Sequence, residues 1–286
     1  MDGIVKKNQN GYFYLINEQN EIYIAKARGL LKRGCAILVG DRVEYRVNSD
    51  GTATILAIHD RTSELFRPPV ANIHELVVTA SVISPDFNQL ITDTMLVIAS
   101  HAGVKPIVCI TKADLAKEEA WRIAEAYTRA GYDSFTVSLQ FPDTVEALQN
   151  HLHGPVIAFT GPSGAGKSSL INRLLGREQF ASGNVSEKTK RGKNTTRHAE
   201  LVRFRDTAFL MDTPGYTSLG IQNMGVKELA GYFPEFHSLS QPCRFNDCRH
   251  MEEPGCAVHH AVVDGVISRT RYESYRRMYG ELKDKS

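Results

Sequence analysis

The stretch from residue 155 to residue 175, PVIAFTGPSGAGKSSLINRLL, constrains the fold of this chain more than any other. An apolar run at 156–159 predicts a buried strand, and Leu170, Ile171 and Leu174 follow at helical spacing. Between them, residues 161–168 match G-x-x-x-x-G-K-[ST] at every fixed position. A strand, a glycine-rich loop and a helix in this order are the context in which that pattern binds phosphate.

The chemistry of this loop follows from its backbone and its last residues. Glycines let several N–H groups point at one anion, and the helix N-terminus adds the positive end of its dipole. Lys167 can reach the β- and γ-phosphates, and the Ser168 hydroxyl can ligate Mg²⁺. We expect nucleotide contacts from Gly161, Pro162, Ser163, Gly164, Ala165, Gly166, Lys167, Ser168 and Ser169.

Length and composition limit the class of protein. A chain of 286 residues is long enough for two or three domains, and a formal charge of +2 does not by itself indicate a nucleic-acid binder. No apolar run reaches the length of a membrane span, and the N-terminus lacks the apolar core of a signal peptide. We therefore expect a cytoplasmic protein, without a membrane partner and monomeric.

The N-terminal part, residues 1–64, predicts a small barrel. Short strands separated by turn residues are expected at 3–6, 12–16, 22–26, 42–47 and 52–58, which suits a five-stranded OB-fold. Such barrels often bind nucleic acid, and Lys26, Arg28, Lys32 and Arg33 cluster in one connection. Acidic residues are nearly as numerous as basic ones here, so a solvated mixed surface is an equally good interpretation.

Residues 65–225 predict a second domain in which strands and helices alternate. Strands are expected at 73–79, 106–110 and 135–137, and helices at 88–101, 116–130 and 144–152. This alternation indicates an α/β fold with a largely parallel sheet, whose ligands bind at the carboxyl ends of the strands.

One of these strands runs into a candidate base-binding motif, Thr111, Lys112, Ala113 and Asp114. The Asp114 carboxylate can accept hydrogen bonds from the ring N–H and exocyclic amine of guanine, donors that adenine lacks at these positions. The Lys112 stem can lie along the base plane. Ser138, just past the next strand, is expected to add a contact through its backbone N–H.

Two further segments complete a nucleotide site. Thr195 and Thr196 lie in a basic loop, and 212–215, Asp-Thr-Pro-Gly, follows an apolar strand at 208–211. Asp212 suits a Mg²⁺ partner and Gly215 offers a backbone N–H to the γ-phosphate. Magnesium is thus expected between Ser168, Thr196 and Asp212. GTPases usually begin with the phosphate loop, whereas here the base motif precedes that loop and the segment 212–215 comes last. We therefore infer a circularly permuted P-loop GTPase domain.

The C-terminal part, residues 226–286, predicts a metal-stapled helical domain. Cys243, Cys248, His250 and Cys256 supply three thiolates and one imidazole within 14 residues, a complete tetrahedral set for one structural Zn²⁺. A stripe of Tyr272, Tyr275, Tyr279 and Leu282 at helical spacing favours core packing over RNA stacking. The arginines among them, at 269, 271, 276 and 277, are expected to be free for phosphate.

The permuted order, the small barrel and the Cys₃His module together resemble the bacterial ribosome small subunit-dependent GTPase A family, over essentially the whole chain. The resemblance implies GTP hydrolysis stimulated by the small (30S) ribosomal subunit, a role in its late maturation and contacts with 16S ribosomal RNA. Many GTPases have Asn where this chain has Thr111, which loses an amide that braces the base site. Tyr216 stands where many have a water-positioning Gln, so His198 becomes the candidate group that orients the attacking water.

Two other classes of function remain open on the residues alone. A kinase or ATPase on the same phosphate loop would show no preference for guanine. A non-enzymatic RNA-binding protein would hold nucleotide only as a structural ligand. The basic loop 188–197 predicts a steep salt dependence of RNA binding in the leading interpretation.

Overall fold

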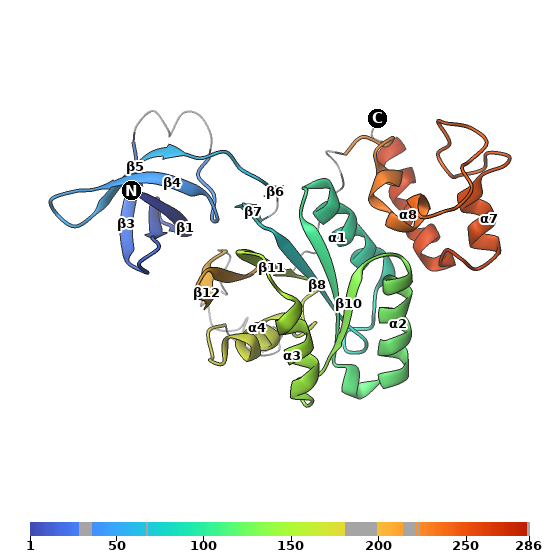
Figure 1. Cartoon of the computed structure of the whole chain (residues 1–286), viewed down its shortest axis with the longest axis horizontal. Helices are drawn as coiled ribbons and strands as arrows, with labels where there is room; N and C mark the ends of the chain where they lie inside the picture. Colours follow the sequence, from blue (N-terminus) through green and yellow to red (C-terminus); the bar gives the residue numbers. More distant parts are fainter. Residues whose placement is uncertain (29–35, 67, 181–198, 214–220, 222–223, 285–286) are drawn as a thin grey trace.

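The computed structural model of the chain describes residues 1–28, 36–66, 68–180, 199–213, 221 and 224–284. A β-barrel, a sheet covered by helices and a C-terminal helical module follow one another along the chain (Figure 1). Several residues singled out above lie outside the described part, namely Lys32, Arg33, Thr195, Thr196, His198, Gly215, Tyr216 and the basic loop 188–197.

The N-terminal strands form a closed barrel in the order β1-β2-β3-β5-β4. All five strands predicted from the sequence are present: β1 (Asp2–Gln9), β2 (Tyr12–Ile16), β3 (Ile22–Ala27), β4 (Arg42–Val47) and β5 (Ala53–Ile58). Closure comes from antiparallel pairing of β1 with β4 and parallel pairing of β3 with β5. Side chains of alternate residues fill the interior, including Val5, Leu15, Val43 and Ile55.

A two-stranded hairpin that the sequence did not predict follows the barrel. It consists of β6 (Glu64–Phe66) and β7 (Pro69–Ala71), so Pro68 lies directly before the second strand and Pro69 begins it. The Arg61 guanidinium donates to both oxygens of the buried Asp41 carboxylate, at 2.8 and 2.9 Å. Asn72 donates to Gly40 O and accepts from the Thr62 N–H. These contacts fix the hairpin against the barrel.

The central sheet has six strands in the order β10-β9-β8-β11-β13-β12. Five strands are mutually parallel: β8 (Glu75–Ser81), β9 (Lys105–Thr111), β10 (Asp133–Val137), β11 (Val156–Thr160) and β13 (Ala208–Asp212). The edge strand β12 (Leu201–Arg205) is antiparallel and was not predicted. Since the expected parallel strands all occur, the α/β prediction is confirmed.

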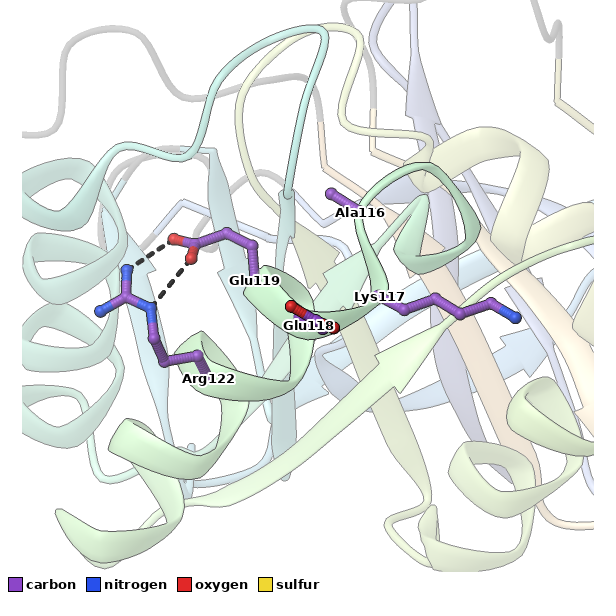
Figure 2. Close-up of a pocket in the computed structure, with 5 residues that line it drawn as sticks. All are labelled: Ala116, Lys117, Glu118, Glu119 and Arg122. Atoms are coloured by element: carbon purple, nitrogen blue, oxygen red, sulfur yellow. Dashed lines mark hydrogen bonds and ion pairs between the residues drawn. The ribbon is translucent and has the colours of Figure 1, made fainter.

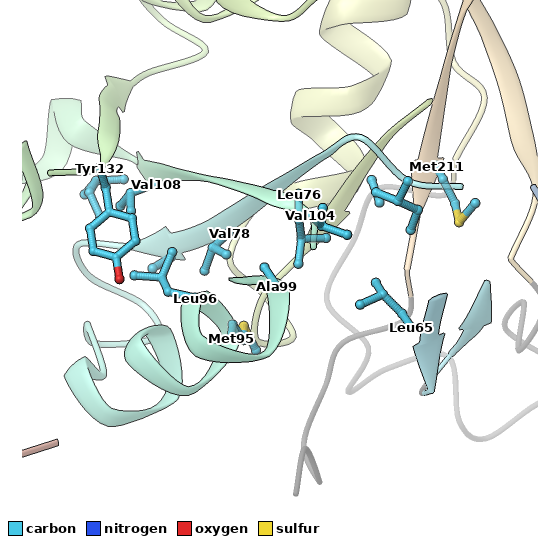
Figure 3. Packing of buried hydrophobic residues seen from close by; sticks show 14 of the residues in the cluster. Leu65, Leu76, Val78, Met95, Leu96, Ala99, Val104, Val108, Tyr132 and Met211 are labelled. Carbon is cyan, nitrogen blue, oxygen red and sulfur yellow. The ribbon is translucent and has the colours of Figure 1, made fainter. Parts of the chain in front are cut away.

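Helices cover both faces of this sheet. They are α1 (Gln89–His101), α2 (Lys117–Arg129), α3 (Pro142–His151) and α4 (Lys167–Leu175), with a 3-10 turn, η2 (Ala113–Leu115), before α2. Alternate residues of a strand point to opposite faces. Leu76 and Val78 of β8 therefore pack with Met95 and Leu96 of α1 (Figure 3), while Val77 packs on the face of α3 and α4.

The C-terminal module consists of η3 (Leu229–Tyr232), α6 (Pro234–His237), α7 (Ala257–Val263) and α8 (Arg269–Lys283). Tyr272, Tyr275, Tyr279 and Leu282 are buried in its core, which confirms that the aromatic stripe of α8 packs internally. The same helix lies against α1 (Figure 1), so the module is joined to the sheet domain by a helix pair.

The prediction that Arg271 is free for phosphate is wrong. Its side chain is 2% exposed and bonds two buried carboxylates, Asp93 of α1 and Glu235 of α6. One guanidinium nitrogen donates to Asp93 Oδ1 at 2.5 Å, and the Nε and the other terminal nitrogen bind the two oxygens of Glu235. Tyr127 of α2 also donates to Asp93, at 2.9 Å. Burial raises the pKa of Asp93, and the Arg271 charge opposes that rise.

The barrel also touches the edge of the central sheet. Lys7 of β1 forms an isolated antiparallel bridge with Glu200, which directly precedes β12. The Glu200 carboxylate pairs with the ammonium groups of Lys6 and Lys7.

Among the helices that the structure describes, none has both the length and the apolar character required to cross a lipid bilayer.

Candidate nucleotide and metal sites

The predicted phosphate and base motifs meet at the carboxyl edge of the sheet. The phosphate loop follows β11, the base motif begins at the last residue of β9, and Asp212 ends β13. In the sheet, β11 lies next to β13 on one side and to β8 on the other, with β9 one strand further. The strand order thus brings together segments that lie up to about a hundred residues apart, as expected for parallel sheets.

The phosphate loop has a backbone that requires glycine. Gly161, Gly164 and Gly166 have φ angles of 142°, 80° and 83°, a region that other residues rarely adopt. A Cβ at Gly161 would also lie 1.9 Å from the Thr79 carbonyl oxygen. Ser163 and Gly164 are exposed at the turn, whereas Ala165 is buried beneath it. The loop can therefore present its N–H groups to an anion.

Lys167 is enclosed by the loop that it ends. Its ammonium group donates to the carbonyl oxygens of Gly161 and Pro162, at 2.8 and 2.9 Å, and the residue is 7% exposed. Burial lowers the pKa of Lys167, and the nearby negative charge of Asp212 opposes that change. A cation held at this buried position attracts phosphate oxygens more strongly than it would in water.

Ser168 and Asp212 lie in direct contact, as the expected Mg²⁺ site requires. The Ser168 hydroxyl donates to Asp212 Oδ2 at 2.8 Å. The other carboxylate oxygen, Oδ1, is buried and has no hydrogen-bond partner in the described part of the chain. Burial raises the pKa of Asp212, an effect that a bound cation would reverse. A carboxylate oxygen without a partner beside a serine hydroxyl fits Mg²⁺, which prefers oxygen ligands. Ser169, which is also expected to contact nucleotide, lies in the first turn of α4.

Asp114 and Ser138 come together at the base end of the site. The Ser138 hydroxyl donates to Asp114 Oδ1 at 2.6 Å. The expected contact of the Ser138 backbone N–H with the base needs correction, because that N–H donates to Thr144 Oγ1 at 3.0 Å. Ser138 is therefore placed to orient the carboxylate rather than to bind the base through its backbone.

The other two residues of the base motif have distinct environments. Lys112 adopts a left-handed backbone (φ 55°), and its ammonium group donates to the Ser84 carbonyl. Ala113 is buried at the start of η2. The sequence interpretation missed the segment around Ser84, which lies beside the phosphate loop. A Cβ at Gly164 would lie 3.4 Å from Pro85 of this segment. The available signal was its position at the end of β8, at the same edge as the phosphate loop.

A surface hollow near the base motif is not the nucleotide site. It lies at the start of α2 and is lined by Ala116, Lys117, Glu118, Glu119 and Arg122 (Figure 2). Arg122 is bonded to Glu119 by two hydrogen bonds, at 2.9 and 2.7 Å. No residue of the phosphate loop or of the base motif lines the hollow, so it is separate from the groups that would bind the nucleotide.

The four predicted metal ligands form one cluster. The ligand atoms of Cys243, Cys248, His250 and Cys256 all lie within 4.8 Å of one another. The His250 Nδ1 is 3.5 Å from the sulfurs of Cys243 and Cys256, and those sulfurs are 4.0 Å apart. Tetrahedral zinc with bonds of about 2.3 Å to sulfur and about 2.0 Å to nitrogen separates its ligands by roughly 3.5–3.8 Å. The separations among Cys243, His250 and Cys256 are close to these values, so the cluster is compatible with a tetrahedral metal site.

The α8 tyrosines hold the backbone of the metal loop. The Tyr272 hydroxyl donates to the His250 carbonyl at 2.7 Å, and the Tyr275 hydroxyl donates to the Arg249 carbonyl at 2.5 Å. Backbone N–H groups of residues 257 and 259 donate to the sulfurs of Cys243 and Cys256. Such outer contacts orient the ligands and stabilise thiolate charge.

Comparison with known proteins gives a consistent family assignment. The family model described as RsgA GTPase matches residues 58–222, and that of the RsgA N-terminal domain matches residues 2–55. A relative from Clostridium botulinum, named small ribosomal subunit biogenesis GTPase RsgA, is 36% identical over 100% of this chain and 98% of its own. A relative of the same name from Caldanaerobacter subterraneus subsp. tengcongensis is 37% identical over 100% and 97%.

Solved structures agree with this assignment. The crystal structure of YloQ, described as a circularly permuted GTPase, has a TM-score of 0.81 and 31% identity over 100% of this chain and 96% of its own. YjeQ from Thermotoga maritima has a TM-score of 0.84 and 30% identity over 100% and 99%. The permuted order inferred from the motifs is thus also that of a solved structure.

Proposed function

We propose that this chain, which belongs to the RsgA GTPase family, binds GTP with Mg²⁺ and hydrolyses it to GDP and phosphate during late assembly of the small ribosomal subunit. The observation that supports this most is the meeting of Asp114 and the phosphate loop at one sheet edge. A carboxylate beyond the base-binding strand selects guanine, because adenine would leave it without donors. The family relatives are named for small-subunit biogenesis, which suggests the biological partner.

The mechanism follows from the groups that surround the phosphates. Lys167 and the N–H groups of the loop stabilise the charge that develops on the phosphate oxygens during hydrolysis. Ser168 and Asp212, with Thr196 from the adjoining loop, would hold Mg²⁺, which neutralises charge between the β- and γ-phosphates when bound. The backbone N–H of Gly215 would bind the γ-phosphate. Thr195 is the alternative to Thr196 as the threonine ligand of Mg²⁺.

Low intrinsic turnover is part of the proposal. Tyr216 occupies the place where a Gln orients water in many GTPases, and a phenol suits this task poorly. Docking on the ribosomal subunit would then order the loop and direct His198 at the attacking water. Subunit-stimulated turnover that is unchanged in His198→Ala would contradict this role.

The remaining parts of the chain would serve the ribosomal partner. We divide the chain into an OB-fold domain (1–64) that contacts 16S ribosomal RNA, a permuted GTPase domain (65–225) and a zinc-binding domain (226–286). The Cys₃His cluster leaves no open coordination position, so its Zn²⁺ would be structural. The protein would act as a cytoplasmic monomer.

Turnover of GTP by the full chain, with and without small ribosomal subunits, tests the proposal. We expect slow GTP hydrolysis that the subunit accelerates and that Lys167→Ala abolishes. ATP should not be hydrolysed in place of GTP. Asp114→Ala should remove the preference for guanine nucleotides over adenine nucleotides. The exposed Glu118, four residues further along the chain, provides the control Glu118→Ala. Equal use of ATP would indicate a kinase or ATPase, and absence of turnover would indicate an RNA-binding protein.

A further inference from the structure

Thr111 ends β9, and its hydroxyl is already used by the protein. The residue is 5% exposed. Its hydroxyl oxygen lies 2.7 Å from the Ala165 carbonyl oxygen and 3.3 Å from that of Ala80. Its own carbonyl accepts the Val82 N–H at 3.1 Å. A hydroxyl has one proton to donate, so the contact with Ala165 leaves no donor on this side chain for a ligand.

This hydrogen bond joins two parts of the nucleotide site. Thr111 is the last residue of β9 and the first of the base motif, whereas Ala165 lies in the phosphate loop after β11, and β8 separates the two strands. The Thr111 hydroxyl therefore reaches across β8 to the loop. It also lies 3.9 Å from the position of a Cβ on Gly166, so the side chain fits closely beneath the loop.

The consequence concerns the edge of guanine that Asp114 does not read. Guanine has donors on the edge that Asp114 would bind, and acceptors at N7 and O6 on another edge. A side chain at position 111 needs a free donor to contact N7. An asparagine amide has two donor hydrogens and an acceptor, so it can bind the protein and the base together, whereas a threonine hydroxyl cannot donate twice.

We propose that Thr111 is a positioning residue that fastens the base motif to the phosphate loop, and that guanine recognition by this chain uses no contact from residue 111 to N7. The proposal rests on the proposed function, because it specifies how the same site reads its nucleotide. Selectivity for guanine then depends on the hydrogen bonds that the donors on one edge of the base make to the Asp114 carboxylate.

Equilibrium binding of GDP and 7-deaza-GDP to the full chain, measured by calorimetry, tests the missing contact. Removal of an acceptor that a buried donor uses would leave that donor unpaired and weaken binding about tenfold or more. We expect the two affinities to agree within about threefold, because no such donor exists at residue 111. Binding of 7-deaza-GDP that is tenfold weaker would overturn the proposal.

Two variants test the positioning role. Thr111→Val keeps the shape and removes the hydroxyl, so GDP and 7-deaza-GDP should both bind about three- to tenfold more weakly, by the same factor. Thr111→Ser keeps the hydroxyl and should restore most of the affinity, which a general packing defect would not allow. Unchanged binding by Thr111→Val, or unequal loss for the two nucleotides, would refute the role. Failure of the wild type to prefer GDP over ADP would instead refute the proposed function.

Discussion

Replacement of Arg271 by methionine should be among the most damaging single changes in the C-terminal module. Methionine keeps much of the apolar stem but leaves the carboxylates of Asp93 and Glu235 buried without their cation. Removal of one partner from a buried ion pair typically costs about 3–5 kcal/mol. Tyr127 and Gln89 still donate to Asp93, so we expect a loss within that range rather than above it.

The loss should also depend on pH. Burial already raises the pKa of Asp93, and without the opposing charge of Arg271 the pKa should rise further. A carboxyl whose pKa is higher in the folded state than in the unfolded state binds its proton more tightly when folded. The cost is therefore largest above the raised pKa and decreases as the pH falls toward the ordinary aspartate value of about 3.9.

Urea unfolding provides the measurement, followed by the fluorescence of Trp121, the single tryptophan, and by circular dichroism. Arg277→Met on the exposed face of α8 is the matched control, and it should change the free energy of unfolding by about 0.5 kcal/mol or less. Adding Asp93→Asn and Glu235→Gln to Arg271→Met should recover part of the loss. A cost below about 1 kcal/mol, or one that does not vary with pH, would refute the reasoning.

Three further changes have defined outcomes. Gly161→Ala should abolish GDP binding, since its Cβ would lie 1.9 Å from a carbonyl oxygen, whereas calorimetry of Gly231→Ala, which meets nothing within 4 Å, should match the wild type. Ser138→Ala removes a hydrogen bond to a carboxylate and should weaken GDP binding about tenfold; a change below about twofold would contradict the orienting role. Cys256→Ser should lower the zinc content from about one per chain, measured by atomic absorption, and lower the melting temperature. Zinc content should not change in Cys109→Ala, a buried cysteine outside the cluster.

The sequence predicted those parts of the site that depend on short segments of backbone. The phosphate loop, the base motif and the Cys₃His cluster each combine fixed spacing with one local conformation, so the residue pattern suffices to locate them. The parallel strands were also predictable, because each is a short apolar run followed by a helical pattern. Their meeting at one edge follows from the common direction of parallel strands.

Features that depend on distant partners were not predictable in the same way. Arg271 shares a helical face with Tyr275 and Met278, so its burial had a local signal, but one of its partners lies 178 residues away. Strands β6 and β7 of the hairpin have three residues each, and pairing partners decide whether they and β12 form strands. The use of the Ser138 N–H by Thr144 likewise depends on how the following helix begins.

The contact of the barrel with Glu200 also bears on solubility. Strand β12 is one of the two outer strands of the sheet, and an outer strand offers unpaired backbone groups to which a strand of another molecule can add. Strand β1 meets the start of this edge through the bridge of Lys7 with Glu200, and Lys6 adds a second positive charge there. Lysines at sheet edges discourage such addition. We therefore expect the barrel to hinder strand addition at the start of this edge.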